Sequence, residues 1–550
     1  MGKWFKSGSP WIWMTGGAVS LSLISVLGLL LLIAWRGLSY FWPAEIYQWE
    51  LQDQQGQRSQ LIGEIYDKEE VPTERLRSAG HQFNQDPGEF VTRYLVKTGN
   101  REFVGLDFRW ILATDIVSRS TPADVAMIER TKNGNFYGYP VAVIEDGKRL
   151  SLDDVQHSLE EHIARAVDIA DQALALQKRD IGSINYAMEK LRLKERRYEL
   201  DNALTESRKL ELETEQTRLN EDYKVLEKKL FALRDLAARD SVIVRDMRGQ
   251  EVALKLDSVL DVTYVNRMNT LDKIGHWFVG LGRFVSDDPR EANTEGGVFP
   301  AIFGTVFMVM LMAVIVTPFG VVAAIYLHEY AKKGPITKMI RIAVINLAGV
   351  PSIVYGVFGL GFFVYMMGGS IDQLFYPEAL PSPTFGSPGV IWSALTLAIL
   401  TLPVVIVSTE EGLSRIPSQV RQGSLALGAT KAETLWRIVI PMASPAIMTG
   451  LILAVARAAG EVAPLMLVGV VKLAPTLPID LNFPFVHLER KFMHLGFHIY
   501  DVGFQSPNVE AARPLVYATS FLLVSVIVAL NLTAISVRNH LREKYRSLEH

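Results

Sequence analysis

The sequence predicts an α-helical integral membrane protein with six transmembrane helices and an α+β domain inserted between the first and second helices. The chain has 550 residues, of which 49% are hydrophobic, and its apolar residues are concentrated in blocks. A spanning helix needs about 20 predominantly apolar residues. Six blocks meet that length, near residues 12–35, 298–327, 342–368, 389–408, 445–471 and 514–537. One long polar stretch, residues 42–295, separates the first block from the second.

The first apolar block is predicted to be a retained membrane anchor. Its apolar core at residues 19–34 is long for a signal peptide. No cleavage site of small residues follows it.

Composition excludes several classes of function. The net charge of −3 argues against a nucleic-acid partner. The chain contains no cysteine, which excludes disulfides and cysteine-based metal or nucleophile chemistry. No phosphate-cradling GxxxxGK[ST] loop is present, so ATP hydrolysis would have to come from another chain, and this chain is not expected to be an enzyme.

No metal or other cofactor is expected either. No histidine or carboxylate cluster in the sequence has the spacing of metal ligands. His487, His494 and His498 fall in a polar loop in which no carboxylate brackets them, and they are expected to be surface residues.

Basic residues beside the short loops predict the orientation of the spans. They cluster at the ends of alternate spans: Lys3, Lys6, Lys332, Lys333, Lys338, Arg415, Arg421, Lys431, Arg437, Arg538, Arg542, Lys544 and Arg546. One topology satisfies all of these clusters, with both chain ends in the cytoplasm. Residues 42–295 then lie on the far side of the membrane, which is the periplasm in a Gram-negative cell. Glu329, Glu410 and Glu411 lie at cytoplasmic ends of spans and are expected to be solvated.

The polar block at 42–295 contains predicted strands on either side of a helical segment. Residues 103–111 and 141–144 have strand-like composition, and the Asn-Gly and Tyr-Gly pairs within 131–139 indicate turns. Residues 151–239 are rich in Glu, Lys, Arg, Leu and Ala, as in long helices. Residues 241–265 return to a strand-like alternation.

Within the helical segment, apolar residues follow the three–four spacing of a coiled-coil seam. They are Ile181, Ile184, Met188, Leu191, Tyr198, Leu212, Leu219, Tyr223, Leu226, Leu230 and Leu233. Polar residues fall on the same seam in its middle: Glu195, Asn202, Thr205, Lys209 and Gln216. We therefore expect an antiparallel hairpin, either with residues 151–178 as one arm or with a bend in the polar middle. The hairpin is either a docking arm for a partner or a stabilising spacer, and charged heptads alone do not distinguish the two.

A polar segment between the fourth and fifth blocks, QGSLALGATKAETLWRIVIP at residues 422–441, is the most informative stretch. Its order is a short helix, Gly428, a second short helix and then Pro441. Gly428 permits a turn with positive φ, and Pro441 can begin a helix without losing a needed N–H group. This order resembles the cytoplasmic "EAA" loop of ABC importer permeases, in which Glu-Ala-Ala stands where this chain has Gln422-Gly423-Ser424.

Three further motifs resemble PstA, a permease family of the phosphate-specific ABC importer. They are GGVFPAIFGT at 296–305, NLAGVPSIVYGVFG at 346–359 and ARAAGEVAP at 456–464. The resemblance covers about residues 296–538 and implies an ABC permease core there. The remaining segments are then residues 1–41, a cytoplasmic tail with the first helix; residues 42–295, a periplasmic domain with its arm at 151–239; and residues 539–550, a cytoplasmic tail.

The resemblance also implies partners and a location. The location is the bacterial inner membrane, where lipid surrounds the spans. The partners are a PstC-like permease, a PstB-like ATPase dimer, a periplasmic phosphate-binding protein and a phosphate-sensing regulatory system. The transported solute is inorganic phosphate. Contacts to the ATPase are implied for Gln422, Gly423, Ser424, Gly428, Ala429, Ile438 and Pro441.

Arg457 and Glu461 are the ionisable pair that the sequence places inside the fifth block. Four residues apart, they share one helix face and can form an ion pair. Charges within a bilayer usually face a cavity or a partner, and arginine offers a planar fork that matches phosphate oxygens. The pair is either part of a phosphate pathway or a salt bridge that fixes the bundle.

A second candidate for the pathway is the break at residues 349–352. A proline within a span frees backbone groups, and transporters use such breaks for substrate sites. Ser352 and Tyr355 add hydroxyl groups there, and Asn346 adds an amide. The other interpretation is a simple proline kink at a helix interface.

Two competing functions remain open. The first is an importer for another oxyanion, such as molybdate or phosphonate. The second is a membrane-anchored coiled-coil scaffold or sensor that carries no solute. The scaffold would explain residues 151–239, but it would leave Arg457, Glu461 and the 422–441 loop without a purpose.

Overall fold

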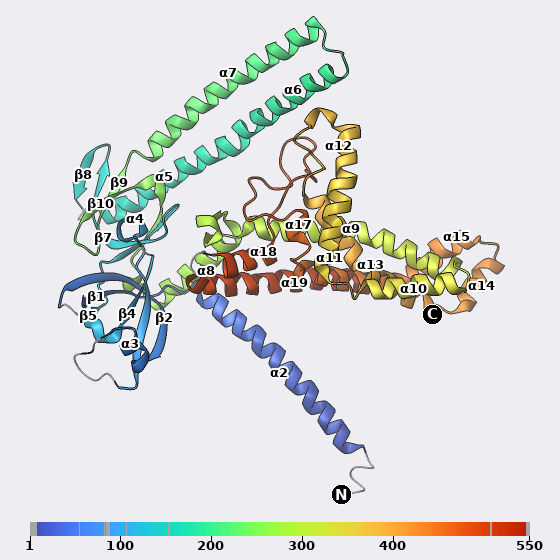
Figure 1. Ribbon diagram of the computed structural model, residues 1–550, viewed down its shortest axis with the longest axis horizontal. Coiled ribbons are helices and arrows are strands. Elements are labelled where there is room, and N and C mark those ends of the chain that lie inside the picture. The colour runs from blue at the N-terminus through green and yellow to red at the C-terminus, as the bar shows by residue number, and fades with distance from the viewer. Residues whose placement is uncertain are drawn as a thin grey trace. The chain divides into compact units, whose positions relative to one another are not determined.

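A computed structural model describes residues 8–545 except 54–55, 82, 84–87, 106, 152–154 and 507–508. The predictions made for Lys3, Lys6 and residues 546–550 lie outside the described residues. The chain divides into two compact units (Figure 1). Unit 1 comprises residues 1–40, 285–294 and 298–550, and unit 2 comprises residues 41–284 and 295–297.

Unit 1 contains the six membrane helices, and the predicted fold class is confirmed. Among the described residues, six helices are long and apolar enough to cross a membrane. The candidate spans are Trp11–Ser39, Phe299–Tyr330, Ser352–Phe375, Val390–Ser414, Lys431–Gly460 and Ala512–Glu543. Their helices are α2 (Ser9–Ser39), α9 (Phe299–Ile325) with η7 (Tyr326–Tyr330), α11 (Ser352–Phe358) with η8 (Gly359–Gly368) and α12 (Gly369–Phe375), α13 (Val390–Ser414), α15 (Lys431–Thr434) with η10 (Leu435–Val439) and α16 (Ile440–Gly460), and α19 (Val509–Tyr545).

The third span differs from the predicted block at 342–368. The first part of that block belongs to a separate helix, α10 (Pro335–Leu347), and the span itself begins at Ser352. Pro351 is therefore the N-cap of α11 and does not lie in mid-span, as the sequence suggested. The cause is local, because a proline disfavours helical backbone in the residue before it.

Small residues allow the spanning helices to pack closely. A Cβ atom on Gly320 of α9 would lie 2.6 Å from a methyl carbon of Val405 on α13. A Cβ atom on Gly412 of α13 would lie 2.5 Å from Cβ of Ala446 on α16. Close approach of this kind is how helices associate in lipid, where the hydrophobic effect does not drive them together. The helices α9, α13 and α16 thus form the buried centre of unit 1.

Unit 2 is built on two antiparallel sheets. The first has the strand order β4-β3-β2-β1-β5, and the second has the order β10-β9-β7-β6-β11, with β8 paired to β7. The strands are β1 (Ile46–Gln52), β2 (Arg58–Pro72), β3 (Phe90–Lys97), β4 (Phe108–Leu112), β5 (Ile116–Ser120), β6 (Ala126–Arg130), β7 (Phe136–Glu145), β8 (Lys148–Ser151), β9 (Ser241–Arg245), β10 (Glu251–Lys255) and β11 (Val259–Thr263).

The turns and strands of unit 2 can be compared with the sequence predictions. Asn133 and Gly134, with φ of 67° and 69°, connect β6 to β7, as the Asn-Gly pair predicted. The turn predicted from the Tyr-Gly pair is wrong, because Tyr137 and Gly138 lie within β7 and pair with β6. The prediction of a strand over 103–111 is wrong in its first part. The short helix α4 (Arg101–Val104) lies there, between Asn100 and Gly105, which both have positive φ. The strand pairing begins only at Phe108.

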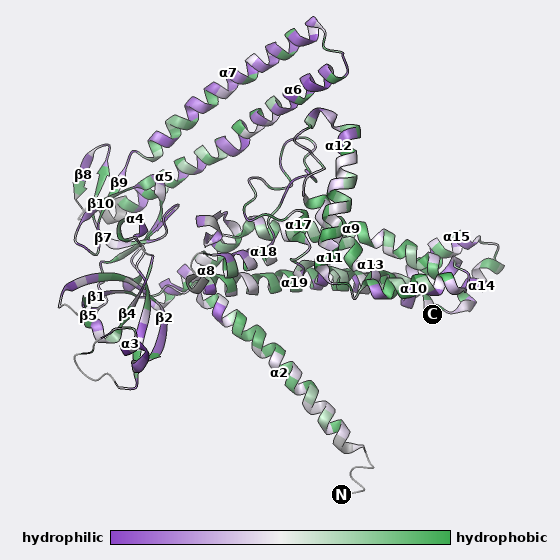
Figure 2. Ribbon diagram, in the orientation of Figure 1, coloured by the Kyte–Doolittle hydropathy of each residue, from purple (hydrophilic) through white to green (hydrophobic). Residues whose placement is uncertain are grey.

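An antiparallel helical hairpin projects from the second sheet (Figure 1). One arm is α5 (Val155–Ala175), η3 (Leu176–Ile181) and α6 (Gly182–Leu200), and the other is α7 (Glu206–Ala237). The chain reverses after Leu200, in the polar middle of the seam, so the second of the two predicted hairpins is the one observed. Thr205 caps α7 by accepting the Arg208 N–H at 3.4 Å. Polar residues dominate α6 and α7, whereas α2, α9 and α19 are largely apolar (Figure 2).

The base of the hairpin belongs to the core of unit 2. Leu159, Ile163 and Ala166 of α5 are buried in one cluster with strand residues of the second sheet. Farther along, Ile181 and Leu230 share a second buried cluster that joins the two arms. The first turns of α5 are therefore part of the folding unit, and the remainder of the hairpin packs mainly on itself.

One further helix of unit 2, α8 (Thr270–Ser286), has no counterpart among the sequence predictions. The spacing of its apolar residues was visible in the sequence at Leu271, Ile274 and Phe278. The remaining helices of unit 1 are short: α14 (Ser418–Ala426), α17 (Leu465–Val468) and α18 (Leu495–Tyr500).

Candidate functional site

Arg457 and Glu461 lie where the fifth spanning helix ends. The helix α16 stops at Gly460, and Glu461 follows in extended conformation, so the pair is not inside a continuous helix as the sequence suggested. The Nε atom of Arg457 lies 3.6 Å from Oε1 of Glu461, which forms the expected ion pair. Their side chains are 33% and 21% exposed. Both charged side chains are therefore partly accessible at the surface of this chain.

The beginning of the third span lies against this broken end of α16. A Cβ atom on Gly356 of α11 would be 2.7 Å from Cα of Pro464, so only a glycine allows this approach. Tyr355 is buried and lies within electrostatic reach of Arg457. Its hydroxyl donates to the carbonyl of Leu347 at the end of α10. Tyr355 thus joins α10 to α11 through the carbonyl of Leu347, which also accepts the N–H of Val350 at 3.3 Å.

The other two residues predicted at this break are placed less centrally. Ser352 is half-buried at the first position of α11. Asn346 is exposed in the last turn of α10, and its backbone carbonyl accepts the N–H of Gly349 at 3.0 Å. Tyr355 is thus within electrostatic reach of Arg457, whereas Asn346 is exposed at the end of α10.

The 422–441 segment folds as two short helices around a glycine. Helix α14 ends at Ala426, Gly428 has φ of +87°, and α15 begins at Lys431. Thr430 and Glu433 form a capping box at the start of α15. The hydroxyls of Ser424 and Thr434 are 2.8 Å apart and buried, which joins the two helices.

The second short helix continues directly into the fifth span. The helical path is unbroken from Lys431 to Gly460, so Pro441 lies within it, near the start of α16. The π-helical turn η10 stands immediately before this proline. A proline lacks the N–H that the preceding turn would use, and a wider turn accommodates that loss. Movement of α15 would therefore be transmitted to α16.

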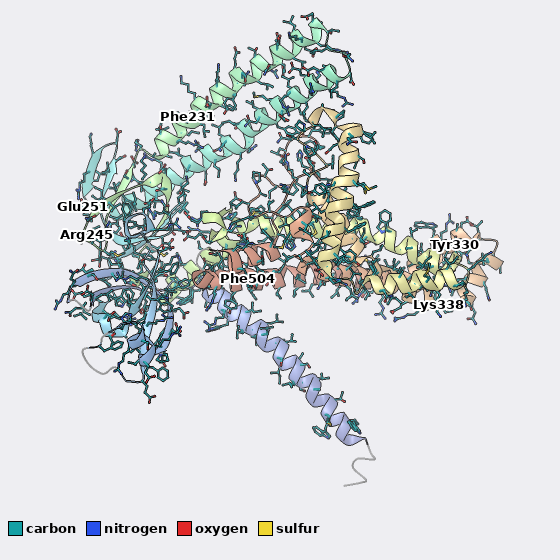
Figure 3. The ribbon with its side chains drawn as sticks, in the orientation of Figure 1. Phe231, Arg245, Glu251, Tyr330, Lys338 and Phe504 are labelled. Carbon is teal, nitrogen blue, oxygen red and sulfur yellow. The ribbon has the colours of Figure 1, made fainter. Side chains whose placement is uncertain are left out.

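The loop is fixed to the end of the second span by Glu329. Arg421 forms an ion pair with Glu329 at 3.0 Å, and Lys431 donates to the carbonyl of Glu329 at 2.6 Å. Arg421 also donates to the carbonyls of Leu413 and Ile416, at 2.8 and 2.9 Å. The ammonium of Lys431 lies 4.1 Å from the ring centre of Tyr330. Figure 3 shows Tyr330 at the end of unit 1 that carries α14 and α15.

These contacts correct the prediction that the glutamates at the cytoplasmic ends of the spans are solvated. The side chain of Glu329 is only 11% exposed. Glu410 is 18% exposed and pairs with Arg341 at 3.0 Å, beside a cavity of about 470 Å³. Glu411, which also lines that cavity, is exposed as expected. The sequence missed both ion pairs because their members are far apart along the chain.

Three large apolar side chains are exposed on the loop. Leu425, Leu427 and Trp436 are 47%, 90% and 71% exposed. Around them lie the predicted contact residues, of which Gln422 and Gly423 are exposed, and Ala429, Ile438 and Pro441 are half-buried. Large apolar side chains that are this exposed on a polar loop mark an interaction surface.

The three loop histidines are buried, which contradicts their prediction as surface residues. His487, His494 and His498 are 2%, 1% and 3% exposed. His487 lies 2.9 Å from Asp480 and 3.2 Å from Glu489, so carboxylates do bracket it. Burial alone would raise the pKa of Asp480, but hydrogen bonds from Asn482, Arg490 and His487 outweigh it and lower that pKa to about 2. The loop folds back on itself, which its polarity did not indicate.

His494 and His498 belong to a polar cluster at the start of α18. Nδ1 of His494 accepts the N–H of Gly496 at 3.1 Å, as a neutral imidazole can. Burial lowers the pKa of both histidines to about 4; for His498, Asp501 opposes this shift and Lys472 adds to it. Lys472 pairs with Asp501 at 3.0 Å. Both imidazoles are therefore neutral at pH 7.

One group of three side chains in unit 2 has the geometry of metal ligands, but nearby arginines account for it. Ligand atoms of Glu145, His162 and Asp240 lie within 4.8 Å of one another. Both oxygens of Asp240 already face guanidinium groups, one from Arg165 and one, at 2.8 Å, from Arg239. These two guanidinium groups already supply the positive charge that a metal ion would bring. The network ties the base of the hairpin to β7 and β9.

Comparisons with known proteins identify the membrane region. Residues 316–547 match the family "Binding-protein-dependent transport system inner membrane component". The chain is 34% identical over 245 residues to "Phosphate transport system permease protein PstA 1" of Mycobacterium tuberculosis, covering 44% of this chain and 71% of that protein. It is 33% identical over 256 residues to "Phosphate transport system permease protein PstA" of Yersinia pestis, covering 46% and 77%. The chain belongs to the PstA family of ABC permeases.

The residues that match the family, 316–547, lie within unit 1. "Probable ABC transporter permease protein YqgI" of Bacillus subtilis is 29% identical over 255 residues, which are 45% of this chain and 79% of that protein. A solved structure of the MetNI methionine ABC transporter covers 44% of this chain and 94% of its own, with 15% identity and a TM-score of 0.33. Its family membership and its six apolar helices identify this chain as a multi-pass inner-membrane permease subunit of an ABC importer.

Proposed function

We propose that this chain carries inorganic phosphate across the inner membrane as one of two permease subunits, the other being PstC-like. The observation that carries the proposal is the ion pair of Arg457 and Glu461, both partly exposed, at the broken end of a spanning helix. Relatives at 33–34% identity that are named as phosphate transport permeases support the choice of solute.

The chemistry of the pair suits a partly protonated phosphate. The guanidinium of Arg457 offers two parallel N–H donors to two phosphate oxygens. The carboxylate of Glu461 accepts a hydrogen bond from a protonated phosphate oxygen, which a fully deprotonated sulfate lacks. Each charge partly neutralises the other while no phosphate is bound, which lowers the cost of keeping them in the membrane region.

The residues around the break shape this pathway. The hydroxyl of Tyr355 is engaged by the Leu347 carbonyl, so we assign it the positioning of α10 against α11 beside Arg457. Ser352, which is half-buried, and Asn346, which is exposed, are proposed as polar lining residues that phosphate meets on its way.

We assign ATPase docking to α14 and α15. The exposed side chains of Leu425, Leu427 and Trp436 supply an apolar contact surface for a PstB-like ATPase dimer. The ion pair of Arg421 with Glu329 keeps this surface rigid, and the continuous helix from Lys431 to Gly460 leads from it to Arg457. Gln422, Gly423, Ser424, Gly428, Ala429, Ile438 and Pro441 keep their proposed role as the residues of this coupling loop.

In this proposal the ATPase lies in the cytoplasm, and unit 2 lies in the periplasm. The helical hairpin of unit 2 is then positioned to meet a periplasmic phosphate-binding protein or the partner permease. Coupling to a phosphate-sensing regulatory system is a further proposed connection. Membership in a permease family argues against a scaffold that transports no solute. The remaining alternative is that the chain transports another oxyanion, such as molybdate or phosphonate.

Radiolabelled phosphate uptake tests the proposed solute. A strain that lacks this chain should lose high-affinity uptake and recover it with the wild-type gene. Uptake should resist a hundredfold excess of molybdate or methylphosphonate but not of unlabelled phosphate. Strong competition by molybdate or by the phosphonate would identify that oxyanion as the solute instead.

A further inference from the structure

The helix α8 of unit 2 exposes an apolar stripe along one face. Leu271, Ile274, Phe278 and Val285 are 78%, 39%, 62% and 38% exposed. Their positions correspond to i, i+3, i+7 and i+14, which lie on one side of an α-helix. Asp272, Lys273, His276 and Arg283 lie outside this stripe.

The polar side of α8 is attached to its own domain. Arg283 reaches Glu129 on β6 and Asp261 on β11, both at 3.4 Å. At 100° per residue, Arg283 is on roughly the opposite side of the helix from Ile274 and Val285. The apolar stripe therefore faces away from the sheet that holds α8.

The end of α8 is held at the point where the chain leaves the membrane. The ring of Phe284 lies 5.1 Å from the ring of Phe41, and Phe284 is buried. Phe41 comes two residues after Ser39, the last residue of the spanning helix α2. Beyond the same end of α8, a short connection leads to the spanning helix α9, which begins at Phe299. The C-terminal end of α8 is thus in contact with the residue that follows one span and is close along the chain to the start of another.

We propose that α8 is an interfacial helix that lies in the surface of the phospholipid bilayer. The occupant of its apolar stripe is lipid, at the boundary between headgroups and acyl chains of the membrane that α2 and α9 cross. An amphipathic helix with exposed Leu and Phe on one face and charges on the other is suited to this position. Trp277, next to the stripe, is of the type enriched at the headgroup level.

This assignment gives unit 2 a second attachment to the membrane besides its chain connections. It does not depend on which solute unit 1 transports, nor on which side of the membrane unit 2 occupies. The proposed occupant of the stripe is lipid, whereas the proposed partner of the 422–441 loop is a protein.

Site-directed spin labelling tests the proposal directly, because the chain has no native cysteine to remove. Single cysteines would be introduced as Leu271→Cys and Phe278→Cys on the stripe and as Lys273→Cys on the polar side. Leu31→Cys in the exposed middle of α2 is the lipid reference, and Glu213→Cys on α7 is the aqueous reference. Labelled full-length protein in phospholipid vesicles would be probed with oxygen, which partitions into lipid, and with a water-soluble nickel chelate.

The labels at 271 and 278 should be relaxed strongly by oxygen and weakly by nickel, shifting toward the Leu31→Cys reference. The label at 273 should stay close to the Glu213→Cys reference. Nickel accessibility at 271 and 278 equal to that of the aqueous reference would overturn the proposal. Protection of both labels from oxygen and nickel would overturn it as well, since a protein partner would then cover the stripe.

Discussion

Arg421 and Glu329 form an ion pair at 3.0 Å that connects the loop after the fourth span to the end of the second. Their side chains are 20% and 11% exposed, and Arg421 also donates to two backbone carbonyls. The ion pair thus fixes the 422–441 segment to the helix bundle, as its proposed role in docking an ATPase requires.

Replacing Arg421 should therefore loosen the loop. In Arg421→Ala, two carbonyls and a largely buried carboxylate lose their donor, at a cost of about 1–3 kcal/mol. We expect a lower melting temperature in detergent and a loss of uptake that exceeds any loss of membrane insertion. The exposed Arg415 provides the matched control, and Arg415→Ala should change neither quantity. Equal behaviour of the two variants would show that the ion pair does not stabilise the loop.

Substitutions at two glycines of the loop can distinguish the effect of backbone strain from the effect of contact with a partner. A Cβ atom on either Gly423 or Gly428 would meet no atom within 4 Å, but only Gly428 has a positive φ, +87°. Gly428→Ala should destabilise the loop by about 1–2 kcal/mol because of its left-handed backbone. Gly423→Ala should leave the isolated chain unaffected, and it should impair ATP-driven uptake only if the ATPase approaches that position closely.

The exposed apolar surface of the loop can be tested separately from its fold. Leu427 is 90% exposed, so Leu427→Asp removes no internal contact and should not lower the melting temperature. It should reduce co-purification of the ATPase and reduce uptake. Leu210→Asp, on the exposed side of the hairpin, is a matched control that should leave ATPase binding intact. If the ATPase still co-purifies fully with Leu427→Asp, the docking surface lies elsewhere.

The outer part of the hairpin can be removed without disturbing its base. Ile181 and Leu230 lie in one buried cluster, so a short Gly-Ser bridge can replace residues 182–229. Leu159, Ile163 and Ala166 stay in the core, and the shortened chain should insert normally. If the hairpin docks a binding protein or the partner permease, uptake should fall mainly at low external phosphate. An unchanged phosphate dependence would identify the hairpin as a spacer.

The buried histidines predict a loss of stability in mild acid. The folded-state pKa of His494 and His498 is about 4, below the ordinary value of 6.5. The unfolded chain therefore binds more protons between these values, and stability falls as pH decreases from about 6.5 toward 4. The melting temperature of His498→Gln should depend less on pH over this interval. The exposed His540 is the control, and His540→Gln should retain the wild-type pH dependence.

Local patterns predicted much of the fold. Apolar blocks located the six spans, the Asn133-Gly134 pair located a hairpin, and the polar middle of the heptads located the reversal after Leu200. Each of these features depends on residues that are close in sequence. The stripe on α8 was equally local, and its three–four spacing would have revealed it.

The contacts that define the candidate site were harder to predict because they join distant segments. Glu329 meets Arg421, and Gly356 meets Pro464, although several helices separate the members of each pair along the chain. The polarity of the loop around His487 suggested exposure, but an internal network with Asp480 and Glu489 buries it. The sequence identified Arg457 and Glu461, although not their position at the end of a helix.

The most direct test of the proposed function is phosphate uptake by the reconstituted transport complex that carries Arg457→Ala. Wild-type complex in vesicles should accumulate labelled phosphate when ATP and the binding protein are supplied. The Arg457→Ala complex should assemble and hydrolyse ATP but fail to accumulate phosphate, and Arg457→Lys should recover little because it lacks the two-pronged donor. Uptake by a fully assembled Arg457→Ala complex at the wild-type rate would contradict the account.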